Sequence, residues 1–336
     1  MYFYDNLGNR AAENSMMSTT ASHTIKCTFP NGLYFNERFD KMVQSNKLLY
    51  DIKEHELFLS NIDPIIVHDK IRYFRSLNIK NLSNSEISKE IADVLCVGGM
   101  FIYRPNIATY PSGTEFFRVR KLSIHDNNFK KYSDFWEPPQ NCVKNYGRLN
   151  KVGEALLYVS PMNPWTAINE MKIDEDSPFA LIKYVSNSDV KVNIIGGVCD
   201  YTTLGFTNKN AIFIHEIYND FFRDEFSRDV GVGTEHLYRV SEIIAKQYFD
   251  LPPRDAQDAW AYSSVQDKTK YNVCFRPEIA HDLLNLHGAM ICRIKNDDIM
   301  VHCIAVGTEN EDIKYCQLGS EEQQHLFPEI CKPKTL

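Results

Sequence analysis

The sequence predicts an α+β protein in which a mainly helical N-terminal region precedes a β-rich domain. Apolar residues recur at helical spacing between residues 40 and 100, and short β-rich segments dominate after Pro111-Ser112-Gly113. The 336 residues are 43% hydrophobic and 24% charged, an ordinary globular composition that excludes wholesale disorder. We therefore expect a loose leader at 1–30, a helical region at 31–111, a folded domain at 112–306 and a polar tail at 307–336.

Two helix-start patterns mark the N-terminal region. Asp63-Pro64 is an N-cap followed by proline at the first helical position, and Val67, Ile71 and Phe74 follow on one face. Ser83-x-x-Glu86 is a capping box, and an apolar stripe then runs to the stop at Gly98-Gly99. These stripes predict packed core. The region is expected to bind an inhibitor, mediate homo-oligomerisation, load the protein into a delivery apparatus or extend the core.

The β-rich part predicts strands separated by two longer helices and one shorter helix. The helices are expected near 211–226, near 235–249 and at 277–287. Asn296-Asp297-Asp298 separates two apolar runs and predicts a hairpin. The strands are expected at 116–120, 155–160, 180–185, 190–195, 260–265, 271–276, 289–294 and 299–306.

Charge and cysteine content exclude several classes of function. The net charge of −7 argues against a general binder of phosphate backbones, so no direct nucleic-acid partner is expected. No 18-residue apolar run and no apolar leader are present, which predicts a cytoplasmic chain without a membrane partner; specialised secretion would leave no such mark.

The nine cysteines include no C-x-x-C, and Cys292, His302 and Cys303 fit no zinc spacing, so no metal is expected. His215-Glu216 lacks the second histidine of an H-E-x-x-H motif.

One set of motifs is more specific. Residues 147–158 contain Gly147-Arg148-Leu149-Asn150, then Gly153 and an apolar strand ending in Tyr158, and Ala167-Ile168-Asn169-Glu170 follows. This order resembles the RES domain family. The resemblance is extended by Phe117-Arg118-Val119 upstream and by Tyr262-Ser263-Ser264-Val265 and Tyr271-Asn272-Val273-Cys274-Phe275 downstream. It covers roughly residues 112–280.

The chain departs from the family pattern in three places. Leu149 stands where an aromatic residue is common, and Trp260-Ala261 replaces the customary glycine before Ser264. The interval from Arg118 to Arg148 is longer than usual. These departures lie outside the polar residues of the motifs.

The resemblance implies an ADP-ribosyltransferase-like fold with a split β-sheet that takes NAD⁺ as substrate. Family activities are hydrolysis or phosphorolysis of NAD⁺ and ADP-ribosylation of a protein. Many members are bacterial toxins of the RES-Xre type with a cognate antitoxin. The resulting prediction is an NAD⁺ glycohydrolase or phosphorylase with a cognate antitoxin or immunity protein. The alternatives are a mono-ADP-ribosyltransferase and a non-catalytic nucleotide-binding module.

Cleavage of the nicotinamide–ribose bond requires a fixed dinucleotide and a stabilised oxocarbenium-like ribose. Arg118 and Arg148 are the candidates for the diphosphate, because a guanidinium offers a bidentate fork. Glu170 is the candidate for the ribose hydroxyls and its developing charge. Tyr158 is the candidate for packing on the cationic nicotinamide ring, and Ser264 for orienting either the nicotinamide or Glu170.

Each of these residues alone also has a purely structural interpretation. Arg148 is then a loop arginine, Tyr158 a packing residue and Glu170 a carboxylate on a helix, while Arg118 pairs with a surface acid such as Glu115. Asn150 and Gly153 are expected to shape the loop that places Arg148. The family order of the motifs is what favours the functional interpretation.

Overall fold

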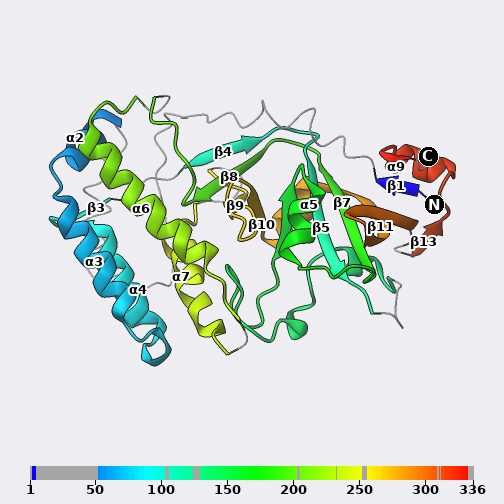
Figure 1. The fold of residues 1–336 in the computed structure, drawn as a ribbon, viewed down its shortest axis with the longest axis horizontal. Helices are drawn as coiled ribbons and strands as arrows, with labels where there is room; N and C mark the ends of the chain where they lie inside the picture. The colour runs from blue at the N-terminus through cyan, green and yellow to red at the C-terminus, as the bar shows by residue number, and fades with distance from the viewer. Residues whose placement is uncertain are drawn as a thin grey trace.

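A computed structural model describes residues 2–4, 52–102, 106–123, 129–202, 205–231, 233–251, 256–308, 310 and 312–331. Most of the predicted leader and the first part of the predicted helical region lie outside these residues. The described chain is a mixed α+β structure, as predicted, with α2, α3, α4, α6 and α7 at one end and a large sheet at the other (Figure 1). The boundaries between the predicted regions remain predictions.

The N-terminal helices begin where the sequence signals place them. Asp63 caps α3, because its side chain accepts a hydrogen bond of 2.9 Å from the backbone N–H of Ile65. Ser83 and Glu86 form the predicted capping box at the start of α4. The predicted apolar stripes of both helices are buried, which confirms them as core. The three helices are α2 (Ile52–Ser60), α3 (Pro64–Ser76) and α4 (Asn84–Leu95).

The rest of the chain alternates strands with five further α-helices among the described residues. The helices are α5 (Pro164–Glu170), α6 (Lys209–Ser227), α7 (Tyr238–Tyr248), α8 (Pro277–Leu283) and α9 (Glu321–Leu326). A short 3-10 helix, η4 (Tyr132–Phe135), directly precedes Trp136. The strands of the main sheet are β1 (Tyr2–Tyr4), β4 (Ile107–Tyr110), β5 (Glu115–Lys121), β6 (Leu157–Pro161), β7 (Phe179–Ser186), β8 (Val190–Ile195), β9 (Ala259–Ser263), β10 (Tyr271–Phe275), β11 (Leu284–Lys295), β12 (Asp298–Gly307), β13 (Ile313–Cys316) and β14 (Ile330–Cys331). A separate short hairpin joins β2 (Cys96–Val97) and β3 (Met100–Phe101).

The strands order as β14-β1-β12-β11-β7-β5-β6-β10-β9-β8-β4, with β13 beside β12. The pairs are antiparallel except β8 with β9, which run parallel and are connected through α6 and α7. The two halves of the sheet meet at β5 and β6 through only two residue pairs, Phe116 with Pro161 and Phe117 with Ser160. An ADP-ribosyltransferase-like arrangement remains a prediction.

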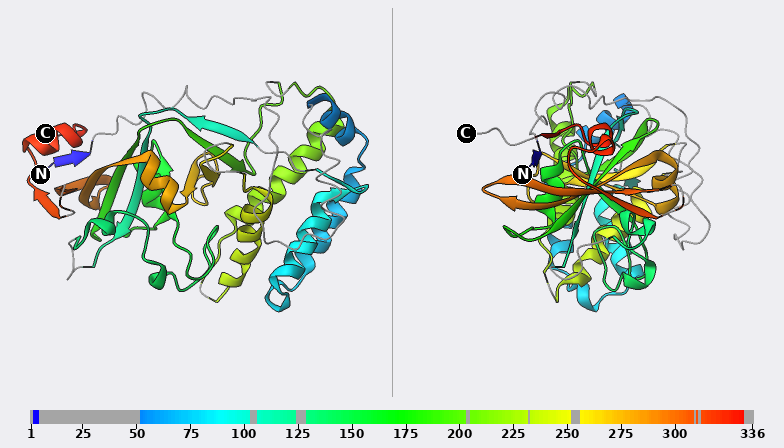
Figure 2. Two further views of the ribbon diagram at one scale, coloured as in Figure 1. Left: turned by 180° about the vertical axis from the view of Figure 1, so that it is seen from behind. Right: turned by 90° about the vertical axis from the view of Figure 1, so that its right-hand side faces the viewer.

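Three apolar cores hold the layers together. The first joins α2, α3 and α4 to α6, α7 and one face of the sheet, and it contains Phe74, Phe221 and Trp260. The second covers the opposite face, and the third packs α5 and the C-terminal segment against β5, β7, β11 and β12. Helices α6 and α7 thus lie between the sheet and the N-terminal helices, as both side views show (Figures 1 and 2).

The predicted hairpin at Asn296-Asp297 is confirmed, since β11 and β12 pair around it and both residues have positive φ. The helix predicted at 277–287 is wrong beyond Leu283. Residues 284–287 instead begin β11, where Leu284 pairs with Ser186 of β7. Pairing along a long buried strand outweighs the weak helical signal of this segment.

Candidate functional site

Glu170 and Ser264 form the centre of the candidate site, although they are 94 residues apart in the sequence. Glu170 is the last residue of α5, and Ser264 directly follows β9. The Ser264 hydroxyl donates a hydrogen bond to Oε1 of Glu170, and the backbone N–H of Val265 donates to the same oxygen at 2.8 Å. Of the two roles expected for Ser264, this geometry is that of the hydroxyl that orients Glu170.

Ser264 is itself held in place by the turn that follows β9. Its side chain is fully buried, and Oγ accepts hydrogen bonds of 3.2 Å from the backbone N–H groups of Gln266 and Asp267. These bonds fix the hydroxyl relative to the end of β9, and the hydroxyl in turn fixes the Glu170 carboxylate. Because the hydrogen bonds from Ser264 and Val265 both use Oε1, the Glu170 carboxylate is oriented through one of its two oxygens.

Arg148 lies in the loop before β6 and reaches the C-terminal end of α6. Its guanidinium donates to the carbonyl oxygen of Phe226 and, at 3.2 Å, to that of Arg228. The carbonyls at the end of a helix carry partial negative charge, so a cation there is favourable. The guanidinium also lies 5.4 Å from the ring centroid of Tyr238, near the start of α7.

Tyr158 supports the loop that carries Arg148. Its hydroxyl donates to Oδ1 of Asn150 at 2.9 Å and accepts from the backbone N–H of Leu149 at 3.1 Å. Burial raises the pKa of Tyr158 well above its ordinary value, so the hydroxyl stays neutral and can donate. The side-chain amide of Asn150 also donates to the backbone carbonyls of Asn145 and Lys151, at 3.4 and 3.2 Å, while Gly153 has a φ of +76°. A stacking role for Tyr158 remains a prediction.

Tyr262 is a buried tyrosine of β9 that was not among the site residues expected from the sequence. Burial raises its pKa well above the ordinary value, and the charge of Arg148 opposes this shift while that of Glu170 adds to it. Both charges therefore lie within electrostatic range of one buried phenol. Tyr262 stands two residues before Ser264 on β9, so the motif that identified Ser264 already contained it.

Arg118 does not join this group. Phe117 of β5 pairs with Ser160 of β6, and Tyr158 lies two residues from Ser160, so Phe117 and Tyr158 share a face of the sheet. The neighbouring Arg118 therefore projects from the opposite face. There it donates to the carbonyl oxygen of Trp136 and hydrogen-bonds Tyr184. The structure thus brings Arg148, Tyr158, Glu170 and Ser264 to one face and places Arg118 on the other.

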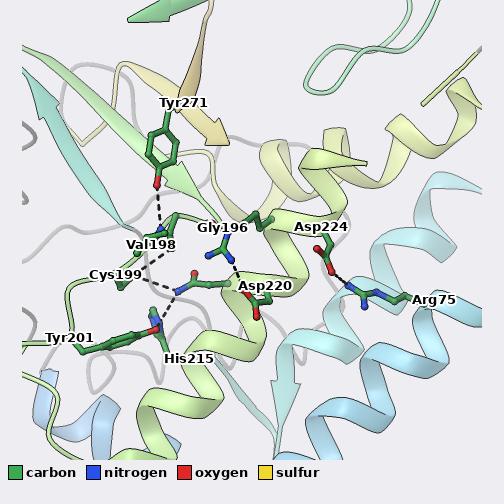
Figure 3. A network of polar contacts seen from close by, with 12 residues as sticks. Arg75, Gly196, Val198, Cys199, Tyr201, His215, Asp220, Asp224 and Tyr271 are labelled. Atoms are coloured by element: carbon green, nitrogen blue, oxygen red, sulfur yellow. Dashed lines mark hydrogen bonds and ion pairs between the residues drawn. The ribbon is translucent and has the colours of Figure 1, made fainter. Parts of the chain in front are cut away.

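A second polar cluster lies where β8 leads into α6 (Figure 3). The side-chain amide of Asn219 donates to Nδ1 of His215 at 2.9 Å and lies 3.5 Å from Sγ of Cys199. The Tyr201 hydroxyl is 3.2 Å from the same ring nitrogen. Asn219 occupies the position at which an H-E-x-x-H motif has its second histidine. The side-chain amide of Asn219 therefore connects Cys199, in the loop after β8, with His215 of α6.

The same loop approaches α6 closely at Gly196. Its φ is +65°, and a Cβ atom there would lie 2.4 Å from the backbone nitrogen of Arg223. Arg223 in turn donates through Nε to the Gly196 carbonyl at 3.0 Å and pairs with Asp220 at 2.6 Å. This contact needs a residue without a side chain.

Within the described part of the chain, no three His, Cys, Asp or Glu side chains are grouped so as to hold a metal ion. The described helices also include none that is long and apolar enough to span a membrane.

The chain matches one curated protein, ribonuclease VapC2 of Methanocaldococcus jannaschii. The two are 32% identical over 113 residues, which is 33% of this chain and 70% of the ribonuclease. No family model matches the chain, and no solved structure matches it.

This match overturns the prediction that the chain is an NAD⁺ glycohydrolase or phosphorylase. The similar protein is a ribonuclease, an enzyme that acts on a phosphodiester rather than on an N-glycosidic bond. The predicted NAD-cleaving function is therefore wrong. The RES resemblance and the binding of NAD⁺ by Arg118 and Arg148 are not tested by these findings and stay predictions.

Proposed function

We propose that this chain, which belongs to the family of ribonuclease VapC2, is an enzyme that cleaves RNA. The match over 113 residues, which covers 70% of that ribonuclease, is the observation that carries the proposal. The geometry at Glu170 and Arg148 supports it. Both residues lie near Tyr262, and together they supply the carboxylate and the cation that phosphodiester cleavage uses.

Arg148 is the residue that would bind the scissile phosphate. A guanidinium has five N–H donors, so it can bind a phosphate while it keeps bonds to the carbonyls of Phe226 and Arg228. Those carbonyls and the Tyr238 ring hold the cation in position before substrate arrives. A fixed cation stabilises the additional negative charge of the pentacoordinate phosphorus without reorganisation.

Glu170 is the residue that would act as general base. Its Oε1 is held by Ser264 and Val265, which leaves Oε2 to accept the proton of a ribose 2′-hydroxyl. The 2′-oxygen then forms a bond to phosphorus while the bond from phosphorus to the 5′-oxygen breaks. The departing 5′-oxygen takes up a proton, from Glu170 or from water, so that charge and protons balance.

A protein inhibitor is the partner that we propose for such an enzyme. An enzyme that degrades RNA without strong sequence restriction would damage the cell that makes it, so its activity needs a partner that blocks it. This is the same class of partner as the antitoxin implied by the sequence. The RNA substrate, by contrast, departs from the expectation drawn from the net charge of −7, because one local cation can bind a phosphate on an acidic protein.

The test is the cleavage of a labelled single-stranded RNA by the purified full chain, with Mg²⁺ and again with a chelator. Glu170→Gln is expected to lower the rate by about 100-fold or more, the usual contribution of a general base. Glu278→Gln, at an exposed position of α8, is the matched control and should leave the rate unchanged. A DNA of the same sequence should resist cleavage, because it lacks the attacking 2′-hydroxyl.

Two results would overturn the proposal. A wild-type chain that cleaves no RNA in either buffer would refute the ribonuclease activity. A Glu170→Gln variant as active as wild type would show that the reaction takes place elsewhere in the chain.

A further inference from the structure

Glu225, in the last turn of α6, is a buried carboxylate to which the proposed reaction gives no part. Its side chain is 1% exposed, and the residues before it on the same face of the helix, Phe221 and Phe222, belong to the first apolar core. Removing a carboxylate from water costs free energy unless charged partners compensate. The partners of Glu225 therefore indicate its role.

Two arginines share one oxygen of this carboxylate. Nη2 of Arg228 lies 2.7 Å from Oε1 of Glu225, and Nε of Arg75, in the last turn of α3, lies 4.0 Å from the same oxygen. Burial raises the pKa of Glu225, and the charges of Arg228 and Arg75 oppose that shift. Figure 3 shows Arg75 reaching across to α6, where it also pairs with Asp224 at 2.7 Å. Glu225 thus joins the end of α6 to a helix of the N-terminal region.

Arg228 in turn presents its backbone carbonyl to Arg148. Both Nη1 and Nη2 of Arg148 donate to this carbonyl oxygen at 3.2 Å. Arg228 follows the last residue of α6, so its carbonyl lies beyond the regular hydrogen bonds of the helix. The pair with Glu225 folds the Arg228 side chain back over the helix end and so fixes this carbonyl.

From this series of contacts we propose that Glu225 is a positioning residue, which holds Arg228 and, through the Arg228 carbonyl, fixes the guanidinium of Arg148. The inference rests on the proposed function, because it takes Arg148 as the group that binds the scissile phosphate. A cation that is already in place needs no reorganisation when charge develops on the phosphate. A displacement of about 1 Å can lower a rate about 100-fold.

The first test compares kcat/KM for RNA cleavage by variants of the full chain. Glu225→Gln removes the charge but keeps the shape, and it should lower kcat/KM about 10- to 100-fold. Asp224→Asn, the matched control, removes the same charge one residue earlier, where the side chain is 51% exposed, and should change kcat/KM by less than about twofold. Arg228→Lys keeps a cation beside Glu225 and should lose less activity than Glu225→Gln.

A double-mutant cycle separates positioning from a purely structural role. In the Arg148→Ala background, Glu225→Gln should cause no further loss of kcat/KM, because the cation that Glu225 positions is gone. A purely structural role would lower the rate by the same factor in both backgrounds. Should Glu225→Gln fail to fold, Arg228→Gln takes its place, since it removes the same ion pair from a side chain that is 32% exposed.

A second measurement follows the Arg148 guanidinium without any reaction. In the full chain labelled with ¹⁵N at the arginine guanidinium groups, hydrogen bonds to two carbonyls should slow the rotation of this group and give separate NMR signals for its N–H protons. Arg148→Lys identifies these signals by their loss. Glu225→Gln should merge them, and Asp224→Asn should leave them separate.

The two measurements distinguish failure of the inference from failure of the proposed function. A wild type that cleaves no RNA, together with merged Arg148 signals in Glu225→Gln, would refute the ribonuclease activity and support the positioning role. Unchanged Arg148 signals in Glu225→Gln would overturn the inference. In a wild type that cleaves RNA, an unchanged rate in Glu225→Gln, or an equal loss with and without Arg148, would overturn it as well.

Discussion

The orientation of Glu170 depends on one buried hydroxyl. Ser264→Ala removes the side-chain donor and leaves Oε1 of Glu170 with the backbone N–H of Val265. Because the lost bond is to a carboxylate, the free energy of unfolding should fall by about 1.5–3 kcal/mol, as measured by urea denaturation. Ser76→Ala, at an exposed hydroxyl bonded to its own helix, should change it by less than about 0.5 kcal/mol. Equal effects of the two substitutions would contradict the assigned role of Ser264.

The contacts of single residues were only partly predictable. The contact of Ser264 with Glu170 was one of the two roles expected for this hydroxyl, and the structure shows that contact. Arg148, however, binds the backbone carbonyls of Phe226 and Arg228. Every residue has a backbone carbonyl, so the residue types do not indicate which carbonyls an arginine will contact. The face of Arg118 depends on strand register, and a shift of one residue reverses it.

The loop before β6 is the element on which the position of Arg148 depends. A Cβ atom at Gly147 would lie 2.2 Å from Oδ1 of Asn150, the atom that accepts the Tyr158 hydrogen bond. Gly147→Ala should therefore displace Asn150, break that bond and lower the free energy of unfolding by about 1–3 kcal/mol. Gly231→Ala is the matched control, because a Cβ atom there meets nothing within 4 Å. If Gly147→Ala were as stable as the control in thermal unfolding, the loop would accommodate the added methyl group without displacing Asn150, and the prediction would be wrong.

Elements with local signals were predictable from the sequence. The helices α3 and α4 begin at their caps because the capping groups lie within three residues of the helix start. The error at 284–287 has the opposite cause. The partner of that segment is β7, about 100 residues earlier, and nothing within the segment indicates it.

At the scale of the whole molecule, an ion cluster around the buried Lys183 attaches the C-terminal segment to the sheet. Lys183 of β7 lies 2.6 Å from Glu115 of β5 and 2.9 Å from Glu329, which follows α9. His287 of β11 lies beside it, and burial together with the charge of Lys183 lowers the pKa of His287 below its ordinary value.

This lowered pKa predicts the dependence of stability on pH. Below the pH at which histidine is ordinarily half protonated, the unfolded chain binds a proton at this position more readily than the folded chain does. The free energy of unfolding should therefore fall as the pH drops below about 6.5. His287→Gln should reduce this slope in chemical denaturation at several pH values. His302, whose pKa is also lowered by burial, stays in place and contributes equally to both proteins. An unchanged slope would show that protonation of His287 does not destabilise the folded chain.

The packing of α3 on α6 also determines what happens while the chain is being made. The ring of Phe74 on α3 lies 5.6 Å from that of Phe221 on α6, and the same core also takes side chains of α7 and of the later strands β9 and β10. A ribosome adds residues in order, so the apolar faces of α2, α3 and α4 emerge long before their partners. At typical rates of synthesis this interval lasts roughly ten to thirty seconds. During that time we expect the nascent N-terminal helices to expose apolar faces of the kind that chaperones bind, and this end to complete its core only after β9 and β10 have been made.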